Sequence, residues 1–333
     1  MVTGQTSSSS ALGRFNIPAA IKSAWAFNPT LTIFTLAAAL LTVIGAIGML
    51  IDPRIVLGMP NWAKSTKFGI SLSLYGAVLL WMLPMITNRP RLVRFVATGI
   101  GGTLLFEIIL LVIQATRGVP VHFNVSTPLN TALWGAMSFT IGIFWLFTAL
   151  GVVLLLFQKL PNRVLAWSVR LGLLLTLIGF TEGFLMTGPN APQMAALEAG
   201  QQLDLIGAHT VGGFDGGPGL PFAGWSTNHG DLRIGHFAGI HAAQIIPLLG
   251  ILLLRRREKW LREGHRLALV ATGAGAYMGL IALLTWQALR DQPLLQPDAL
   301  TLGALAGLIA VTLAAAGATL LHARFGARAA DRL

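Results

Sequence analysis

The feature that most constrains the fold is a series of long apolar segments that recur along the chain. One helical crossing of a hydrocarbon core about 30 Å thick needs about 20 apolar residues. Segments that meet this requirement are residues 30–51, 68–87, 95–116, 131–158, 171–188, 234–254, 267–289 and 300–321. The two-residue alternation of membrane β-barrel strands does not run through them. The sequence therefore predicts an all-α polytopic membrane protein with eight transmembrane helices.

Composition agrees with this class and narrows the chemistry. Hydrophobic residues make up 54% of the chain and charged residues 11%, which is not typical of a soluble globular protein. Cysteine is absent, so disulfides, cysteine-ligated zinc and iron–sulfur clusters are excluded from the chain itself. A metal ion would need histidine, carboxylate or thioether ligands.

The basic residues predict the orientation in the membrane. Most of the 23 Lys and Arg residues fall in alternate connections that share one side of the predicted bundle, together with both ends of the chain. Because cytoplasmic loops carry an excess of Lys and Arg, this predicts a bacterial inner-membrane protein with both termini cytoplasmic. The basic run at 255–262 is then a topology anchor. A nucleic-acid partner is not expected, since no aromatic-rich binding module accompanies the net charge of +11.

Two short patterns recur at matching positions in the two halves. Residues 114–120 and 287–293 share Gln-Ala-x-Arg-x-x-Pro, and residues 40–45 and 174–179 share Leu-Leu-Thr-x-Ile-Gly. The alternative is coincidence among apolar strings, which explains the second match more easily than the first. Four spans return the chain to its starting side, so the matches favour a parallel 4+4 internal repeat.

This repeat defines the predicted organisation. Residues 1–29 are predicted to be a polar tail with a short interfacial helix, and an ordinary linker before the first span is the alternative. The first four-helix half spans 30–165 and the second spans 166–333. The second half carries a long outer loop at 189–233, which is rich in glycine and predicted to fold over the bundle as an ordered lid, with a flexible connector as the alternative.

The most informative polar stretch is residues 225–244, which drives ionisable groups into the mouth of a transmembrane helix. It contains His229, Asp231, Arg233, His236, His241 and Gln244. Such groups are expensive to bury in a membrane and predict a functional site. On a regular helix the two later histidines lie about 140° apart, so that pair alone does not chelate one ion.

Other polar groups are predicted on the same outer side. His122 and Asn124 follow the third span, and His209 and Asp215 lie in the long loop. These residues are the candidates for completing a site with the helix-mouth stretch. Either aspartate, at 215 or 231, is suited to orienting a histidine ligand.

Outer basic residues predict an anion-binding vestibule. Lys64 and Lys67 are three apart and therefore share one helix face, and Arg117, Arg233 and Arg290 are predicted on the same side. The alternative for the two lysines is that they extend to the lipid headgroups.

Two carboxylates fall inside predicted spans, Glu107 and Glu182. Glu107 shares a face with Gln114 and is the candidate proton carrier, together with Asp231 as the second candidate catalytic group. A buried pair that only locks helices together is the structural alternative.

Three functions remain open from the sequence. The first is a metal or haem site for redox or hydrolytic chemistry, with iron, copper or zinc held by ligands from His122, His209, His229, His236 and His241. The second is an anion or proton-coupled transporter with the basic vestibule. The third is a noncatalytic membrane partner or pH sensor. All three imply a lipid bilayer and a small molecule or ion at the outer face, and none specifies the oligomeric state.

Overall fold

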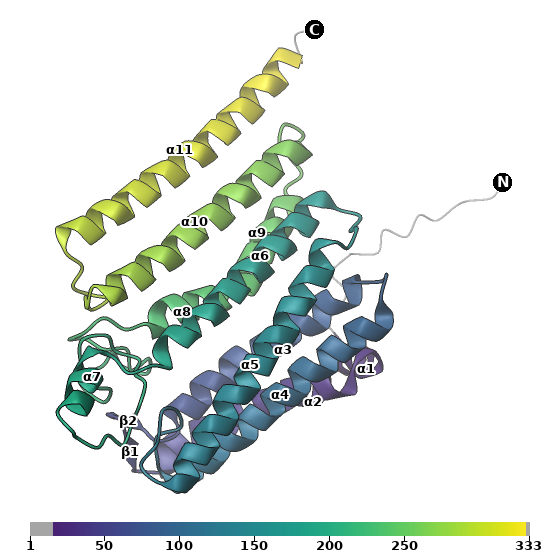
Figure 1. The fold of residues 1–333 in the computed structure, drawn as a ribbon. Coiled ribbons are helices and arrows are strands. Elements are labelled where there is room, and N and C mark those ends of the chain that lie inside the picture. Colours follow the sequence, from purple (N-terminus) through teal and green to yellow (C-terminus); the bar gives the residue numbers. More distant parts are fainter. Residues whose placement is uncertain (1–15, 331–333) are drawn as a thin grey trace.

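The computed structural model describes residues 16–330 and consists mainly of long helices that run along one common direction (Figure 1). The long helices are α2 (Pro29–Ile51), α3 (Ala63–Met82), α4 (Pro90–Arg117), α5 (Pro128–Leu156), α6 (Arg163–Glu182), α10 (Glu263–Leu289) and α11 (Ala299–Ala330). The shorter helices are α1 (Ile17–Phe27), α7 (Ala191–Glu198), α8 (Arg233–Ile240) and α9 (Ala242–Arg255). Two 3₁₀ turns, η1 (Leu83–Met85) and η2 (Gly183–Met186), extend α3 and α6.

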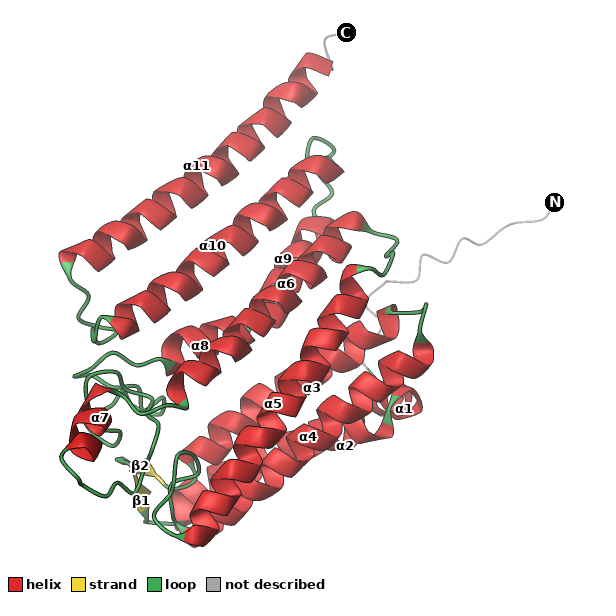
Figure 2. Ribbon diagram, viewed as in Figure 1, coloured by secondary structure: helices red, strands yellow, loops and turns green. Residues whose placement is uncertain are grey.

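One end of the bundle carries most of the irregular structure. The strands β1 (Ile55–Val56) and β2 (Met59–Pro60) form an antiparallel hairpin there, beside α7 and the long loop (Figure 2). We call this the loop end. The described ends of the chain, α1 and the last turns of α11, lie at the opposite end (Figure 1).

The prediction of a multi-pass membrane protein is confirmed at the level of helix number. Seven helical segments in the described part of the chain are long and apolar enough to cross a membrane. The pair α8 and α9, bent by 42°, supplies an eighth crossing if it counts as one broken span. The predicted helix within the N-terminal tail is also present as α1, capped by Asn16.

Local sequence signals set where the spans begin. Asn28, Thr127 and Asn162 occupy N-cap positions and accept hydrogen bonds from backbone amides three residues ahead. Their side chains satisfy amides that the first helical turn leaves without partners. Proline follows directly in α2 and α5, where its missing N–H costs nothing.

Glycines bring two pairs of helices into close contact. A Cβ atom added to Gly45 of α2 would overlap Thr66 of α3, one added to Gly48 would overlap the Trp62 ring just before α3, and one added to Gly179 of α6 would overlap Gly239 of α8. Helices in a membrane associate through such close backbone packing, because lipid supplies no hydrophobic drive between them.

The two halves use the same order of helix contacts. In the first half α2 packs against α3 and α4, and α4 packs against α5; in the second half α6 packs against α8–α9 and α10, and α10 packs against α11. The 4+4 duplication itself, with its boundaries at 30–165 and 166–333, stays a prediction.

The break between α8 and α9 falls at His241. There the Oγ1 atom of Thr176 in α6 donates to the Ile240 carbonyl at 3.4 Å and accepts from the Ala243 amide at 2.8 Å. The Tyr277 hydroxyl of α10 donates to the Ala238 carbonyl at 2.7 Å. Side chains of neighbouring helices thus replace hydrogen bonds that the interrupted helix loses, as backbone at membrane depth requires.

Candidate functional site

A cavity of about 740 Å³ lies between the two halves at the loop end. We call it the chamber. Helices α3, α4 and α5 form one side, and α6, α8 and His241 form the other. Segments near Val121 and from His209 to Ser226 close it toward the loop end. This volume is in the range of pockets that hold drug-sized ligands and cofactors.

The walls of the chamber are largely aromatic and aliphatic. They include Phe68, Leu72, Leu104, Trp134, Met137, Ile141, Phe144, Trp145, Phe180, Phe184, Met186, Trp225, Phe237 and Ile240. Such a lining favours a ligand whose main part is apolar, because its transfer out of water drives binding.

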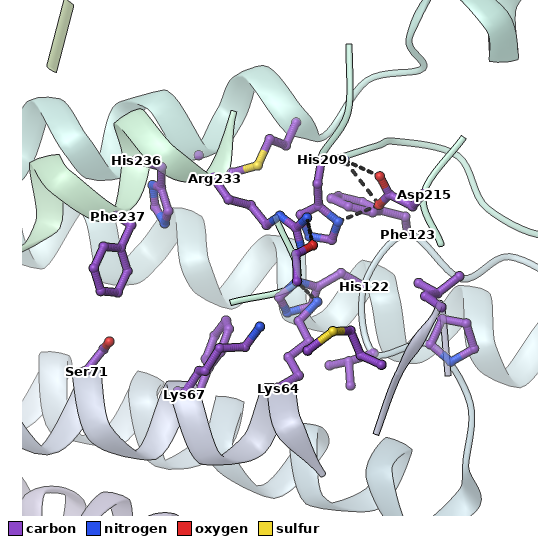
Figure 3. Close-up of a pocket in the computed structure, with 18 of the residues that line it drawn as sticks. Lys64, Lys67, Ser71, His122, Phe123, His209, Asp215, Arg233, His236 and Phe237 are labelled. Atoms are coloured by element: carbon purple, nitrogen blue, oxygen red, sulfur yellow. Dashed lines mark hydrogen bonds and ion pairs between the residues drawn. The ribbon is translucent and has the colours of Figure 1, made fainter. Parts of the chain in front are cut away.

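Three cations stand at the end of the chamber nearest the loops (Figure 3). Lys64 and Lys67 project from α3, and Arg233 projects from α8. The Lys67 ammonium donates to the Ala223 carbonyl at 2.6 Å, and the Arg233 Nη2 atom donates to the Gly224 carbonyl at 2.6 Å. Cations from both halves therefore hold adjacent carbonyls of the long loop. That this loop acts as a lid stays a prediction.

Asp231 fixes Arg233 rather than facing the chamber. Its side chain is 0% exposed, and its carboxylate accepts from Arg233 Nε at 2.8 Å and Nη2 at 2.5 Å. The same carboxylate accepts the Ser226 amide at 2.8 Å. The structure thus places this predicted catalytic residue where it orients an arginine and anchors the lid.

His209 and Asp215, both in the long loop, form a hydrogen-bonded pair that lines the chamber (Figure 3). Burial lowers the pKa of His209 to about 4, so its imidazole is neutral at neutral pH. Burial alone would raise the pKa of Asp215, but the adjacent His209 and two backbone amides outweigh it and hold that pKa below the ordinary value. With Nδ1 bound to the carboxylate and Nε2 bonded to no described residue, this histidine presents an acceptor to the chamber.

His122 lies against the Lys64 ammonium, with 3.0 Å between Nζ and Nδ1. Its ring packs edge-on against Phe68 and is tilted against Trp134. Burial, followed by the charge of Lys64, places the pKa of His122 well below its ordinary value. A neutral imidazole can accept from the ammonium through Nδ1 and leaves its Nε2–H as a donor.

His236 and His241 both line the chamber, although a regular helix would separate them. The helix ends between them, so the angle expected for continuous helix does not apply. The Nδ1 atom of His236 lies 2.7 Å from the Gly179 carbonyl, and the Nε2 atom of His241 lies 3.4 Å from the Ser71 hydroxyl.

The described residues contain no group of three or more His, Asp or Glu side chains placed to hold a metal ion. Among the five histidines predicted as ligands, His229 does not line the chamber and instead contacts the Asp291 carboxylate at 3.1 Å. The other four line the chamber, but the structure does not gather three of them on one point.

Two of the five basic residues predicted to form the anion-binding vestibule, Arg117 and Arg290, lie elsewhere. The Arg117 guanidinium binds the side-chain oxygens of Gln114, at 2.5 Å, and Asn130, at 2.7 Å. Arg290 binds the Asp298 carboxylate at 2.5 Å, an ion pair that raises the pKa of the guanidinium and lowers that of the carboxyl. Neither arginine lines the chamber; both fasten helix ends together.

The remaining predicted residues divide between chamber and scaffold. Glu107 lines the chamber wall, and its Oε1 atom is buried with no hydrogen-bond partner among the described residues. Asn124 lies outside the chamber and accepts from the Ser126 hydroxyl. Gln244 is also outside it, and its buried side chain interacts with His241. Glu182 accepts from Thr285 between α6 and α10.

Sequence reasoning missed Ser71 and the aromatic walls. Ser71 follows Lys64 and Lys67 by seven and four residues, which places all three on one face of α3. That spacing was the available signal, and the aromatic residues carried none because they look like ordinary membrane-facing positions.

No protein-family model, no curated protein and no solved structure matches this chain. The functional argument therefore depends on the chamber alone.

Proposed function

We propose that this integral membrane protein binds an amphiphilic anion in the chamber. The anionic group would occupy the space beside Lys64, Lys67 and Arg233, and the apolar part would extend along the aromatic walls. The observation that carries the proposal is the junction of a large apolar cavity with a cluster of cations at one end.

The charge balance around the chamber favours an anion. Asp231 compensates Arg233, and Asp215 is committed to His209. Within the described residues, no carboxylate lies within ion-pair distance of Lys64 or Lys67. Buried ammonium groups are costly without a counter-charge, and a phosphate or carboxylate of the ligand would supply one.

The contacts between the long loop and two of the cations can be exchanged for contacts with an anionic ligand. The lysine at 67 and the arginine at 233 now bind two uncharged carbonyls of the loop. An anionic oxygen accepts a stronger hydrogen bond than a neutral carbonyl. Ligand binding would therefore replace these contacts and loosen the lid at Ala223 and Gly224.

The basic residues of the sequence favour an orientation with the loop end outside a bacterial inner membrane. In that orientation the ligand enters from the outer leaflet or the outer solution. Glu107, farther along the chamber wall, is the candidate proton carrier if binding is one step of transport.

An internal duplication would explain why the chamber lies between two similar halves. The Gln114 amide donates to the Pro120 carbonyl at 3.4 Å, and the Gln287 amide donates to the Pro293 carbonyl at 2.8 Å. Both members of the shared Gln-Ala-x-Arg-x-x-Pro pattern thus make the same contact. The matching order of helix packing supports the same proposal.

Haem is the second candidate, and His236 favours it. If Nδ1–H of this histidine donates to the Gly179 carbonyl, Nε2 carries a lone pair at the chamber, the arrangement typical of metal-ligating imidazoles. A porphyrin is itself an amphiphilic anion. Haem-loaded protein should show a Soret band that the His236→Ala variant loses; protein that takes up no haem contradicts this candidate.

The main proposal is tested by lipid binding to purified protein, measured by native mass spectrometry in a neutral detergent. Phosphatidylglycerol should bind more tightly than phosphatidylcholine with the same acyl chains. The double variant Lys64→Met, Lys67→Met should bind the anionic lipid at least tenfold more weakly, since a hydrogen bond to a charged group contributes about 1.5–3 kcal/mol.

The matched control removes two lysines that lie outside the chamber. Lys22 on α1 and Lys159 between α5 and α6 are exposed, so Lys22→Met, Lys159→Met changes net charge equally without touching the site. Equal losses in both double variants, or equal affinity for the two lipids, would show that the chamber does not select an anion.

A further inference from the structure

We propose that Ser71 is a nucleophile and His241 its general base, and that together they cleave an acyl ester of the amphiphile held in the chamber. This inference rests on the proposed function, because the same chamber must first bind the lipid-like anion. It adds an activity, ester hydrolysis or acyl transfer, and a substrate class, an ester lipid with an anionic head group.

The first support is the direction of the Ser71 hydroxyl. Hydroxyls inside helices commonly bond to the carbonyl three or four residues earlier, as those of Ser73 and Thr103 do here. The Ser71 Oγ atom instead lies 3.4 Å from His241 Nε2, and the hydroxyl donates to it when the imidazole carries its proton on Nδ1. A nucleophile must be within reach of its base, and this contact is commonly longer before substrate binds.

The second support is the placement of both residues. Ser71 is on α3 and His241 is at the break between α8 and α9, and both line the chamber. The break frees His241 from the regular helical angle, and its ring packs on Phe237 with 4.4 Å between ring centroids. The base is therefore held by the surrounding packing, facing the serine.

The third support is the distance along α3 between Ser71 and the nearest cation, Lys67. Ser71 lies four residues beyond Lys67 on the same face of α3, which is about 6 Å along the axis. In a glycerophospholipid the phosphate and the nearest acyl carbonyl are separated by a few covalent bonds, a similar distance. A phosphate beside Lys67 would thus leave an ester carbonyl near the serine.

The reaction would proceed in two balanced steps. His241 Nε2 takes the proton of the Ser71 hydroxyl while Oγ bonds to the carbonyl carbon. The ester C–O bond then breaks, and the leaving alcohol takes that proton from His241. Water then attacks the acyl-Ser71 carbonyl and gives a proton to His241. The bond to Oγ breaks, His241 returns that proton to Oγ, and a carboxylic acid and the free serine result; an alcohol in place of water would complete acyl transfer.

In the Ser71–His241 pair, the His241 imidazole must carry its proton on Nδ1, so that Nε2 can accept the proton of the Ser71 hydroxyl. The second step also needs water, which would reach the acyl-serine from the loop end of the chamber. A purely structural hydrogen bond between these side chains would require neither reactivity nor access from the chamber.

The test is covalent labelling of the purified full-length protein with a fluorophosphonate probe, which reacts with activated serines. Wild-type protein should be labelled, with the modified peptide containing Ser71. Ser71→Ala should abolish labelling, and His241→Ala should lower its rate at least tenfold. Ser73→Ala is the matched control, since Ser73 lies on the same helix but does not line the chamber.

An unlabelled wild type overturns the inference, as does unchanged labelling of Ser71→Ala. Phosphatidylglycerol binding to Ser71→Ala separates this result from the proposed function. Tight, anion-selective binding beside an unreactive serine would refute the nucleophile and keep the binding site. Binding that is insensitive to Lys64 and Lys67 would refute the site itself, and the proposed lipid ester with it. Fatty-acid release from phosphatidylglycerol, lost in both variants but kept in Ser73→Ala, is the confirming readout.

Discussion

Asp231→Asn should release the lid from the chamber. The carboxylate is 0% exposed and accepts four hydrogen bonds, from the Ser226 amide at 2.8 Å and from the backbone amide, Nε and Nη2 of Arg233. The asparagine side chain is nearly the same size but is uncharged, and its NH₂ group must face one of these donors. Arg233 then stays partly buried without its counter-charge.

Removing one partner of a buried ion pair costs about 3–5 kcal/mol. We take the lower figure, because Asn keeps one acceptor oxygen and Arg233 is partly solvated. A cost of about 3 kcal/mol on the closed lid corresponds to an increase of about a hundredfold in the population of open lid.

Limited digestion with chymotrypsin measures this population. The lid presents Phe214 and Phe222, which are 54% and 50% exposed, and cleavage needs the surrounding backbone to open. The cleavage rate in the long loop should rise by about the same factor while the bundle stays folded. Asp204→Asn, an exposed residue of the same loop, is the control and should leave the rate unchanged. A rise of less than threefold in Asp231→Asn would refute the assignment of this carboxylate as the lid anchor.

Three further predictions follow from other parts of the structure. The folded-state pKa of His209, about 4, lies below the ordinary 6.5, so the unfolded state binds the proton first as the pH falls. The free energy of unfolding should therefore be largest above pH 6.5 and fall by up to about 3 kcal/mol toward pH 4. Thermal unfolding in detergent measures this, and its pH dependence should be weaker in His209→Phe. Gly179→Val should displace α8 from α6 and lower the yield of monodisperse protein in size-exclusion chromatography, whereas Gly317→Val, at an open position of α11, should not; equal yields would contradict the close packing. Since the chain lacks cysteine, single cysteines at Asp204 and Lys159 report topology: in intact cells an impermeant maleimide should label only the first, and the reverse pattern would invert the proposed orientation.

The spans were predictable because each depends on local composition. Apolar length, Asn or Thr caps and proline at the first turn all lie within a few residues of each helix end. The break at His241 was not predictable in the same way. It depends on Thr176 and Tyr277 from two other helices, and no local signal reports which side chains will be near.

The candidate site was predicted in part. Lys64, Lys67, Arg233, His122, His209, His236, His241 and Glu107 were all identified as functional candidates from their chemistry, and the structure places them around one chamber. Residue type alone did not show which of the basic side chains already form hydrogen bonds or ion pairs with neighbouring residues. Arg117 and Arg290 carry the same charge as Arg233, but each fastens a helix end to a neighbour. Pairing is decided by tertiary contacts, which a single sequence does not contain.

The break between α8 and α9 has a consequence for how the protein is made. Its lost hydrogen bonds are replaced by Thr176 from an earlier helix and Tyr277 from a later one. While the chain is being inserted, α6 is already in the bilayer and α10 is still to come. Thr176 can serve the Ile240 carbonyl and the Ala243 amide before α10 is made, and the Ala238 carbonyl accepts the His241 amide within the segment itself. The bend should therefore form against α6 first, and Tyr277 should add its hydrogen bond when α10 arrives. Every residue that lines the chamber precedes α9, so its walls should be in place before α10 and α11 are inserted, and those two helices should then hold the bent segment from outside.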